Sequence, residues 1–167
     1  MKTIQYLTLI IGLFLGSCQT NEKDQQLYEE GISLELAQLR KQEIKDLKYD
    51  LSFSIPEQKQ EAVEGEARIQ FSLQRPQEII LDFRESADKV KEVSVNGQPS
   101  EYTFLNEHII LPEGSTIEGE NEVHIRFTAG DQSLNRNDEY LYTLLVPDRA
   151  RTVFPCFEQP NLKAEFT

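Results

Sequence analysis

The alternation of apolar and polar residues between positions 49 and 55 constrains the fold of this chain more than any other feature. Every second residue of the run is apolar, namely Tyr49, Leu51, Phe53 and Ile55. A period of two places these side chains on one face of an extended strand, whereas a helix would scatter them around its axis. Pro56 ends the run, because proline lacks the donor that a strand ladder needs. The run therefore predicts a strand with one buried and one solvated face.

More strand patterns follow at short intervals. Alternation recurs at 67–73 and at 123–127, an apolar run at 79–81 indicates a more deeply buried strand, and 108–111 is a further strand. Residues 93–95 lead into Asn96-Gly97, a dipeptide that favours a type I′ turn, and residues 102–104 continue the hairpin on its far side. Many short strands separated by turn residues predict an all-β fold, either a β-sandwich or an open curved sheet.

One short helix is expected before the first strand. Ser33 is a good N-cap, and Ile32, Leu36 and Leu39 then form a narrow apolar stripe at helical spacing. The residues before it, 18–31, are mostly polar and predict a tether rather than part of the domain. We therefore divide the chain into residues 1–17, 18–31 and a β domain over residues 32–167.

The first residues have the pattern of an export signal. Lys2 precedes an apolar run from Leu7 to Leu15, which is too short to span a membrane, since spanning takes about 20 residues. Leu15-Gly16-Ser17-Cys18 resembles the lipobox of bacterial lipoproteins, which implies cleavage after residue 17 and a lipid anchor on Cys18. Gln19 favours the outer membrane as destination, facing the periplasm or the cell surface. The alternative is a secretory signal that happens to end in a cysteine.

The net charge limits the possible binding partners, and the cysteine count limits the possible disulfides. The chain carries a net charge of −12, so it does not attract nucleic acid or anionic lipid by electrostatics. If Cys18 is acylated, Cys156 is the single remaining cysteine and an intramolecular disulfide is excluded. A lone thiol in an oxidising compartment survives best when it is buried, so we expect Cys156 to be buried.

The chain shows no reaction centre of its own. His124 is predicted on the polar face of a strand and His108 at the start of another, and neither has a second ligand at metal-binding spacing. Neither H-E-x-x-H nor G-x-S-x-G occurs. The spacing of acidic and amide residues at 131–137 is superficially that of a calcium loop, but Arg136 stands where glycine is needed. We interpret 130–138 as a solvated loop, followed by an apolar segment at 140–146.

The end of the sequence carries the most specific motif. It reads Arg151-x-x-Phe154-Pro155-Cys156-Phe157-Glu158-Gln159-Pro160-x-x-Lys163-Ala164-x-Phe166. This motif resembles a signature of the zinc aminopeptidases related to aminopeptidase N and leukotriene A4 hydrolase, and the likeness extends back to about Tyr49. The resemblance implies a saddle-like N-terminal β domain that packs against a separate catalytic domain, which we expect beyond Thr167. That domain would hold the zinc ion and cleave N-terminal residues from peptide substrates, and this chain alone would be non-catalytic.

Two positions depart from the family pattern. Relatives place a glutamine and a glutamate before the signature, where they bind the free amine of the substrate, and this chain has Leu144 and Val146 at the matching positions. An apolar pair cannot bind an ammonium group, so these residues are a possible pocket wall, unless the alignment is shifted by one residue. The usual Asp-Glu of the signature is Glu158-Gln159 here, and a single carboxylate at this turn favours a structural role.

The signature itself is interpreted as a packing turn. Phe154 and Phe157 would bury large apolar surfaces, Pro155 and Pro160 would make the turn rigid, and Cys156 would act as a small buried hydrophobe. We expect ion pairs among Arg151, Glu158 and Lys163. The competing hypothesis is a stand-alone β-sandwich lipoprotein that binds peptide or glycan without catalysis.

Overall fold

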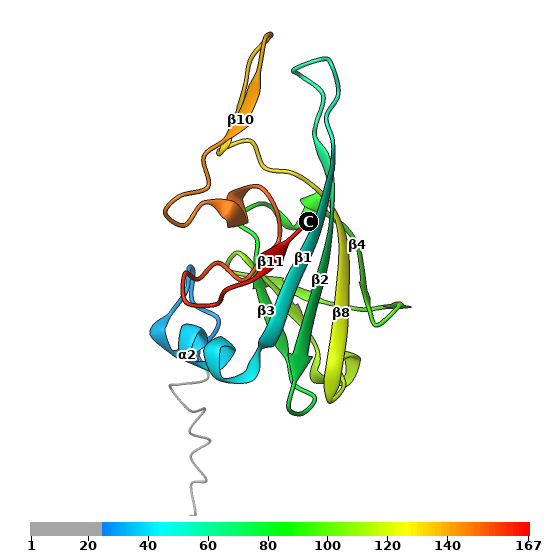
Figure 1. Ribbon diagram of the computed structural model, residues 1–167, viewed down its shortest axis with the longest axis vertical. Helices are drawn as coiled ribbons and strands as arrows, with labels where there is room; N and C mark the ends of the chain where they lie inside the picture. Colours follow the sequence, from blue (N-terminus) through cyan, green and yellow to red (C-terminus); the bar gives the residue numbers. More distant parts are fainter. Residues whose placement is uncertain (1–24) are drawn as a thin grey trace, which may run out of the picture.

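The computed structural model describes residues 25–167, and its main feature is a six-stranded sheet with the order β11-β1-β2-β8-β4-β5. The long central strands are β1 (Lys45–Ser54), β2 (Glu64–Leu73) and β8 (Gly119–Thr128), and they lie side by side in Figure 1. The shorter members are β4 (Val90–Val95), β5 (Gln98–Pro99) and β11 (Glu165–Phe166). Only β11 runs parallel to its neighbour, β1. The predicted export signal and Cys18 lie outside the described residues.

A second sheet of three strands closes the sandwich. Its order is β3 (Ile79–Asp82), β7 (His108–Leu111) and β6 (Thr103–Leu105). The inner faces of the two sheets form one core, to which β2 contributes Ile69 and Phe71 and β8 contributes Ile125 and Phe127. The all-β class predicted from the alternation is confirmed.

The outer face of the second sheet is covered by helix α2 (Leu34–Glu43). Ser33 caps this helix as predicted, since its hydroxyl accepts a hydrogen bond from the Leu36 amide at 3.1 Å. Leu36 packs on Ile80 and Ile110, with Leu27 and Tyr28 beside them. Both faces of β3 and β7 are therefore buried. The expected tether ends earlier than predicted, because its last residues already pack against this sheet.

Three short 3-10 helices connect the strands: η1 (Ala87–Lys89), η2 (Glu113–Ser115) and η3 (Ala150–Thr152). Asn96 and Gly97 both have positive φ, as the predicted type I′ turn requires. The hairpin that they join is only β4 with β5. Residues 102–104 are predicted on its far side, but the strand there, residues 103–105, instead crosses over and pairs with β7 in the second sheet.

A small hairpin projects from the sandwich. It consists of β9 (Leu134–Arg136) and β10 (Leu141–Thr143), so the segment predicted as a solvated loop contains a strand. In Figure 1 this hairpin and the connection between β1 and β2 extend in the same direction from one end of the molecule. Arg136 joins these two arms, because its guanidinium donates hydrogen bonds to the carbonyls of Pro56, Gln58 and Glu61.

Candidate functional site

The signature residues 151–160 form a turn whose apolar side chains belong to the core between the two sheets. Phe154 packs edge-on against Phe53 with ring centres 6.3 Å apart, and Phe157 packs in the same way against Phe71 at 5.9 Å. Both phenylalanines and Pro155 are buried, whereas Pro160 is exposed. We call residues 151–160 the signature turn. Its sequence of bulky rings and prolines explains why it is held as one rigid piece of the core.

A buried polar network centred on Asp82 ties this turn to the rest of the domain. Arg40 from α2 contacts both carboxylate oxygens, at 2.7 Å and 2.8 Å. The Glu158 amide donates to Oδ2 of Asp82 at 2.8 Å, and Nδ1 of His108 lies 3.0 Å from Oδ1. The backbones of Asp82 and Cys156 also exchange two hydrogen bonds. Three segments that are distant in sequence therefore meet at one carboxylate.

The charge on Asp82 is stabilised by these partners. Burial alone would raise its pKa, but the Arg40 guanidinium, the His108 imidazole and the Glu158 amide outweigh that effect and hold the pKa below its usual value. Asp82 is fully buried and Arg40 is only 3% exposed. A buried charge of this kind is tolerated because it is paired and hydrogen-bonded.

Cys156, within the signature turn, is buried, in agreement with the expectation from its solitary position. Burial, with the nearby carboxylate of Glu158 as a second cause, raises the pKa of the thiol well above its usual value. A thiol with a raised pKa carries little thiolate, which is the reactive form. The Tyr49 hydroxyl lies close by and accepts a hydrogen bond from the Phe157 amide at 2.9 Å.

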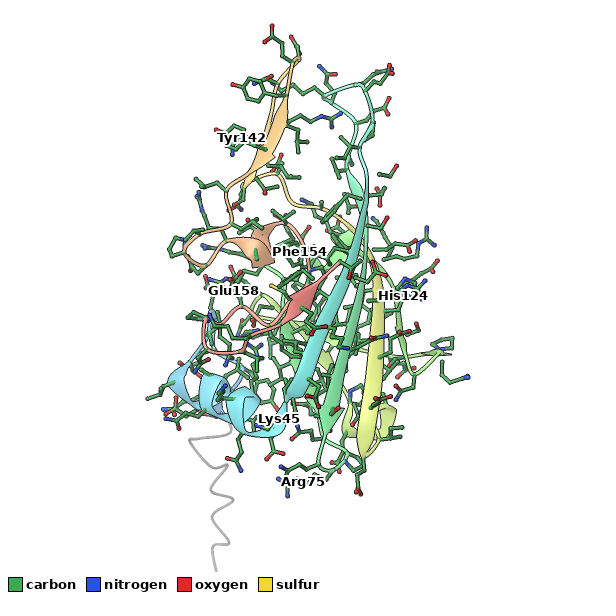
Figure 2. All side chains as sticks on the ribbon, in the orientation of Figure 1. Lys45, Arg75, His124, Tyr142, Phe154 and Glu158 are labelled. Carbon is green, nitrogen blue, oxygen red and sulfur yellow. The ribbon has the colours of Figure 1, made fainter. Side chains whose placement is uncertain are left out.

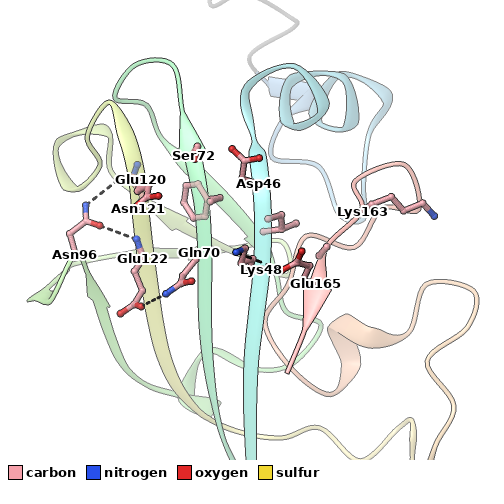
Figure 3. Close-up of a pocket in the computed structure, with 13 residues that line it drawn as sticks. Asp46, Lys48, Gln70, Ser72, Asn96, Glu120, Asn121, Glu122, Lys163 and Glu165 are labelled. Carbon is pink, nitrogen blue, oxygen red and sulfur yellow. Dashed lines mark hydrogen bonds and ion pairs between the residues drawn. The ribbon is translucent and has the colours of Figure 1, made fainter.

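The ion pairs within the signature differ from the prediction. Arg151 pairs with Glu107 at 2.8 Å and with Asp148 at 3.5 Å, while Glu158 instead accepts a hydrogen bond from the Arg151 backbone amide. Lys163 forms no ion pair within residues 25–167; in Figure 3 its side chain extends away from the sheet. The expected cluster fails because Arg151 turns toward β7, where Glu107 precedes the first residue of the strand.

The projecting hairpin presents apolar side chains to solvent. Tyr140, Tyr142, Leu144 and Val146 are 58%, 51%, 50% and 73% exposed. The two tyrosine rings stack with centres 6.0 Å apart. Figure 2 shows Tyr142 on the projecting arm, with Phe154 and Glu158 in the body of the domain. Leu144 and Val146 follow β10 and, with the tyrosines, occupy alternate positions of residues 140–146. Exposed apolar side chains that are neighbours mark a surface for contact with a partner. We call these four residues the hairpin patch.

A polar pocket lies on the outer face of the large sheet, and Figure 3 shows the residues that line it. Gln70 donates to Glu122 at 2.9 Å, Asn96 donates to Asn121 at 3.0 Å, and Lys48 lies 3.6 Å from Glu165. The polar groups of this pocket are thus largely paired with one another.

The two histidines occupy the places predicted from the sequence but form no metal centre. His124 lies on the outer face of β8, 3.5 Å from Glu66, and His108 is fully buried. No group of three or more His, Cys, Asp or Glu side chains within residues 25–167 is arranged to hold a metal ion. These residues therefore do not fit a zinc site. None of the helices in the same range is long and apolar enough to cross a membrane.

Solved structures with a similar fold place the domain within larger proteins. Leukotriene A4 hydrolase from Saccharomyces cerevisiae is 20% identical with a TM-score of 0.61, and the match covers 75% of this chain and 23% of that one. A zinc metallopeptidase from Deinococcus radiodurans is 19% identical with a TM-score of 0.56, covering 74% of this chain and 31% of that one. The chain thus spans less than a third of either structure. No curated protein matches it.

The two-sheet sandwich is thus the fold that the chain shares with these two structures. Residues 45–167 match the family described as the peptidase M1 N-terminal domain, and the chain belongs to that family. The resemblance inferred from the signature and from the strand at Tyr49 is therefore confirmed.

Proposed function

We propose that this chain is the non-catalytic N-terminal domain of an exported zinc metalloaminopeptidase, and that it docks on the catalytic domain and lines part of the substrate pocket. The observation that carries the proposal is the hairpin patch, which lies inside the region that matches the family. In the isolated chain these two tyrosines, one leucine and one valine remain in contact with water. A second domain packed on them would remove this surface from water.

The way in which the hairpin is held supports a docking role. Arg136 fixes it to the arm between β1 and β2 by hydrogen bonds to backbone carbonyls. The Leu144 amide donates to the Ser133 carbonyl at 3.0 Å, and the hydroxyls of Ser133 and Thr152 are hydrogen-bonded to each other at 2.8 Å. A surface that is ordered before binding loses less conformational entropy when it binds.

The pocket wall that we propose consists of Leu144 and Val146. Neither side chain can bind the ammonium group of a peptide, so the amine of the substrate would be bound by the catalytic domain. In the full-length enzyme, Leu144→Ser and Val146→Ser should raise KM for peptide arylamides about tenfold, the scale of altered apolar contacts in a pocket. Leu105→Ser is the matched control, since Leu105 is 44% exposed on β6. Equal kinetics in all three variants would exclude these residues from the pocket.

The zinc ion and the catalysis are assigned in this proposal to the catalytic domain. The coding sequence that follows Thr167 should contain H-E-x-x-H, and a stop codon without that motif would refute the proposal. Purified residues 18–167 should release no arylamine from amino-acid arylamides and bind no stoichiometric zinc by atomic absorption. Activity in this chain alone would equally refute it.

Export and anchoring are part of the same proposal and are supported by the signal pattern ending at Cys18. Cells grown with a clickable palmitate analogue should label the wild-type protein and leave Cys18→Ser unlabelled. Cys18→Ser should also accumulate as the longer precursor, because lipid transfer precedes cleavage at a lipobox. Equal labelling of both proteins would refute acylation at Cys18.

A second candidate is a stand-alone sandwich lipoprotein that binds peptide or glycan without catalysis. The polar pocket favours it, because carboxylates and amides such as Glu122 and Gln70 are the groups that bind sugar hydroxyls. Saturable oligosaccharide binding that is lost in Glu122→Ala, together with a stop codon after Thr167, would favour this function over the first.

A further inference from the structure

Residues 25–44 lie before the region that matches the family, yet they are built into the domain. Leu36 is 1% exposed and packs on Ile80 and Ile110 of the second sheet. The Tyr28 hydroxyl donates to the Glu78 carboxylate at 2.6 Å, and Asn106 donates to the Tyr28 carbonyl at 2.7 Å. This segment is therefore fixed by both apolar and polar contacts.

Further contacts of residues 25–44 reach the signature turn, the residue that follows it, and the network around Asp82. Nε2 of His108 lies within hydrogen-bond distance of the Glu29 carbonyl oxygen, at 2.9 Å. The Gln159 side chain donates to the Ala37 carbonyl at 3.1 Å, and Lys41 donates to the Asn161 carbonyl at 3.0 Å. The N-terminal segment thus contacts the turn from the outer side of the second sheet.

Arg40 makes the most consequential of these contacts. It holds both oxygens of Asp82, and its second nitrogen also donates to the Ile80 carbonyl at 2.7 Å. Its guanidinium also lies over the ring of Phe157, 5.4 Å from the ring centre. The same Asp82 carboxylate accepts the Glu158 amide of the turn. Without Arg40, the Asp82 carboxylate would stay buried without its guanidinium partner, and only its contacts with His108 and the Glu158 amide would remain.

We propose that residues 25–44 act as a latch on the signature turn, and that Arg40 is the positioning residue that fixes the turn through Asp82. The domain then includes residues 25–44, which lie before residue 45, where the family match begins. The latch does not rest on the proposed function. It concerns only how the signature turn is held in place, which does not depend on what the hairpin patch contacts. The competing explanation is a simple apolar cover, in which Leu36 contributes to global stability and Arg40 has no selective effect on the turn.

The Cys156 thiol can report on the latch, since it is buried within the turn and becomes reactive only when the turn opens. The test uses residues 18–167 with Cys18→Ser, so that Cys156 is the single thiol. Under native conditions, Arg40→Met should raise the rate of Cys156 alkylation at least about tenfold, because breaking a buried ion pair leaves a charge without its partner. Arg75→Met is the matched control, since Arg75 is 73% exposed and 3.8 Å from its partner Glu43.

Amide hydrogen exchange distinguishes the latch, which selectively orders the turn, from the apolar cover, which stabilises the whole domain. In Arg40→Met the amides of residues 154–159 should lose protection while the centres of β2 and β8 keep theirs. Arg40→Lys keeps the positive charge but not the bidentate contact with Asp82. Compared with Arg40→Met, it should restore part of the protection of the turn amides. If Arg40→Met does not fold, the same comparison is made with Arg40→Lys against the parent. Equal loss of protection in the turn and in the sheet, or unchanged alkylation, would overturn the latch.

Discussion

The signature turn and the hairpin patch are adjacent in sequence and rich in the same kinds of residue, but they meet opposite environments. The turn buries Phe154, Cys156 and Phe157, and its Phe157 and Glu158 amides donate to Tyr49 and Asp82. The hairpin exposes its tyrosines, and its ties to the body are made by backbone groups and by Arg136. Composition alone does not distinguish a packing segment from a contact segment. The difference lies in whether another part of the domain packs against the segment.

That difference has a physical cause in the order of the strands. The turn returns beneath β1 and β3, where two sheets offer apolar surface on both sides, and the bridge between Asp82 and Cys156 holds it there. The hairpin pairs only with itself, in a two-stranded sheet with no third layer. An isolated two-stranded hairpin buries little apolar surface. The turn therefore contributes stability, and the hairpin leaves its contact surface free.

The sharpest test of this comparison is a matched pair of aromatic truncations. Phe154→Ala should lower the free energy of unfolding by about 3–5 kcal/mol, because it removes a buried ring that packs on Phe53. Tyr142→Ala should change it by less than about 0.5 kcal/mol, since the ring is half exposed. Urea melts followed by circular dichroism measure both. Similar losses of unfolding free energy in the two variants would contradict the distinction between a packed turn and an exposed hairpin.

Thiol reactivity tests the same contrast on a finer scale. In the Cys18→Ser background, Cys156 should react with an aromatic disulfide reagent on the order of 1000-fold more slowly than a cysteine introduced as Tyr142→Cys in a variant that also carries Cys156→Ser. Burial raises the pKa of the Cys156 thiol and the turn must open before it reacts. In denaturing urea the two rates should become equal. Rapid reaction of Cys156 in the native protein would show that the turn is open.

The fold could be predicted in large part because its signals are local. The period-two run at β1 and the positive φ of Asn96 and Gly97 follow from residue types that are neighbours in sequence. The pairing of residues 103–105 with β7 could not be predicted in this way. An alternating strand has the same pattern whichever sheet it joins, so its partner is decided by tertiary packing.

The site was less predictable, because its network uses residues that no motif brings together. Arg40, Asp82 and His108 are separated by long stretches of chain and meet only in the folded domain. A partial signal was present: Leu36, Arg40 and Glu43 share the buried face of α2 at helical spacing, so a charge lay on the side that faces the sheet. Asp82 likewise follows three apolar residues in a strand that is buried along its whole length.

Acid should weaken the turn before it affects the hairpin. Arg40 and its neighbours hold the pKa of Asp82 below its usual value despite burial, so this carboxylate stabilises the fold above about pH 3.9, the value of an unfolded aspartate. The stabilisation is lost as the pH falls through the lower, folded pKa. Urea melts between pH 2 and pH 6 should show this acid loss in the parent and a reduced loss in Asp82→Asn. The exposed Asp138→Asn in the hairpin is the control, and it should keep the parent profile. An Asp82→Asn profile equal to that of the parent would contradict the assignment.

The smallest expected effect concerns Glu158, whose side chain is half-buried in the turn. Burial, followed by the charge of Asp82, raises its pKa above the usual value, although the amides of Arg151 and Ala150 and the charge of Arg151 act in the other direction. A carboxyl with a raised pKa gives its full stabilisation below the unfolded value, about 4.3, and loses it as the pH rises through the folded value. Glu158→Gln keeps an oxygen that accepts the Arg151 amide but cannot ionise. The stability of Glu158→Gln relative to the parent should therefore increase slightly from pH 4 to pH 8 in urea melts. If the stability of Glu158→Gln relative to the parent instead falls as the pH rises, the ionised Glu158 carboxylate stabilises the turn by more than burial and the charge of Asp82 destabilise it.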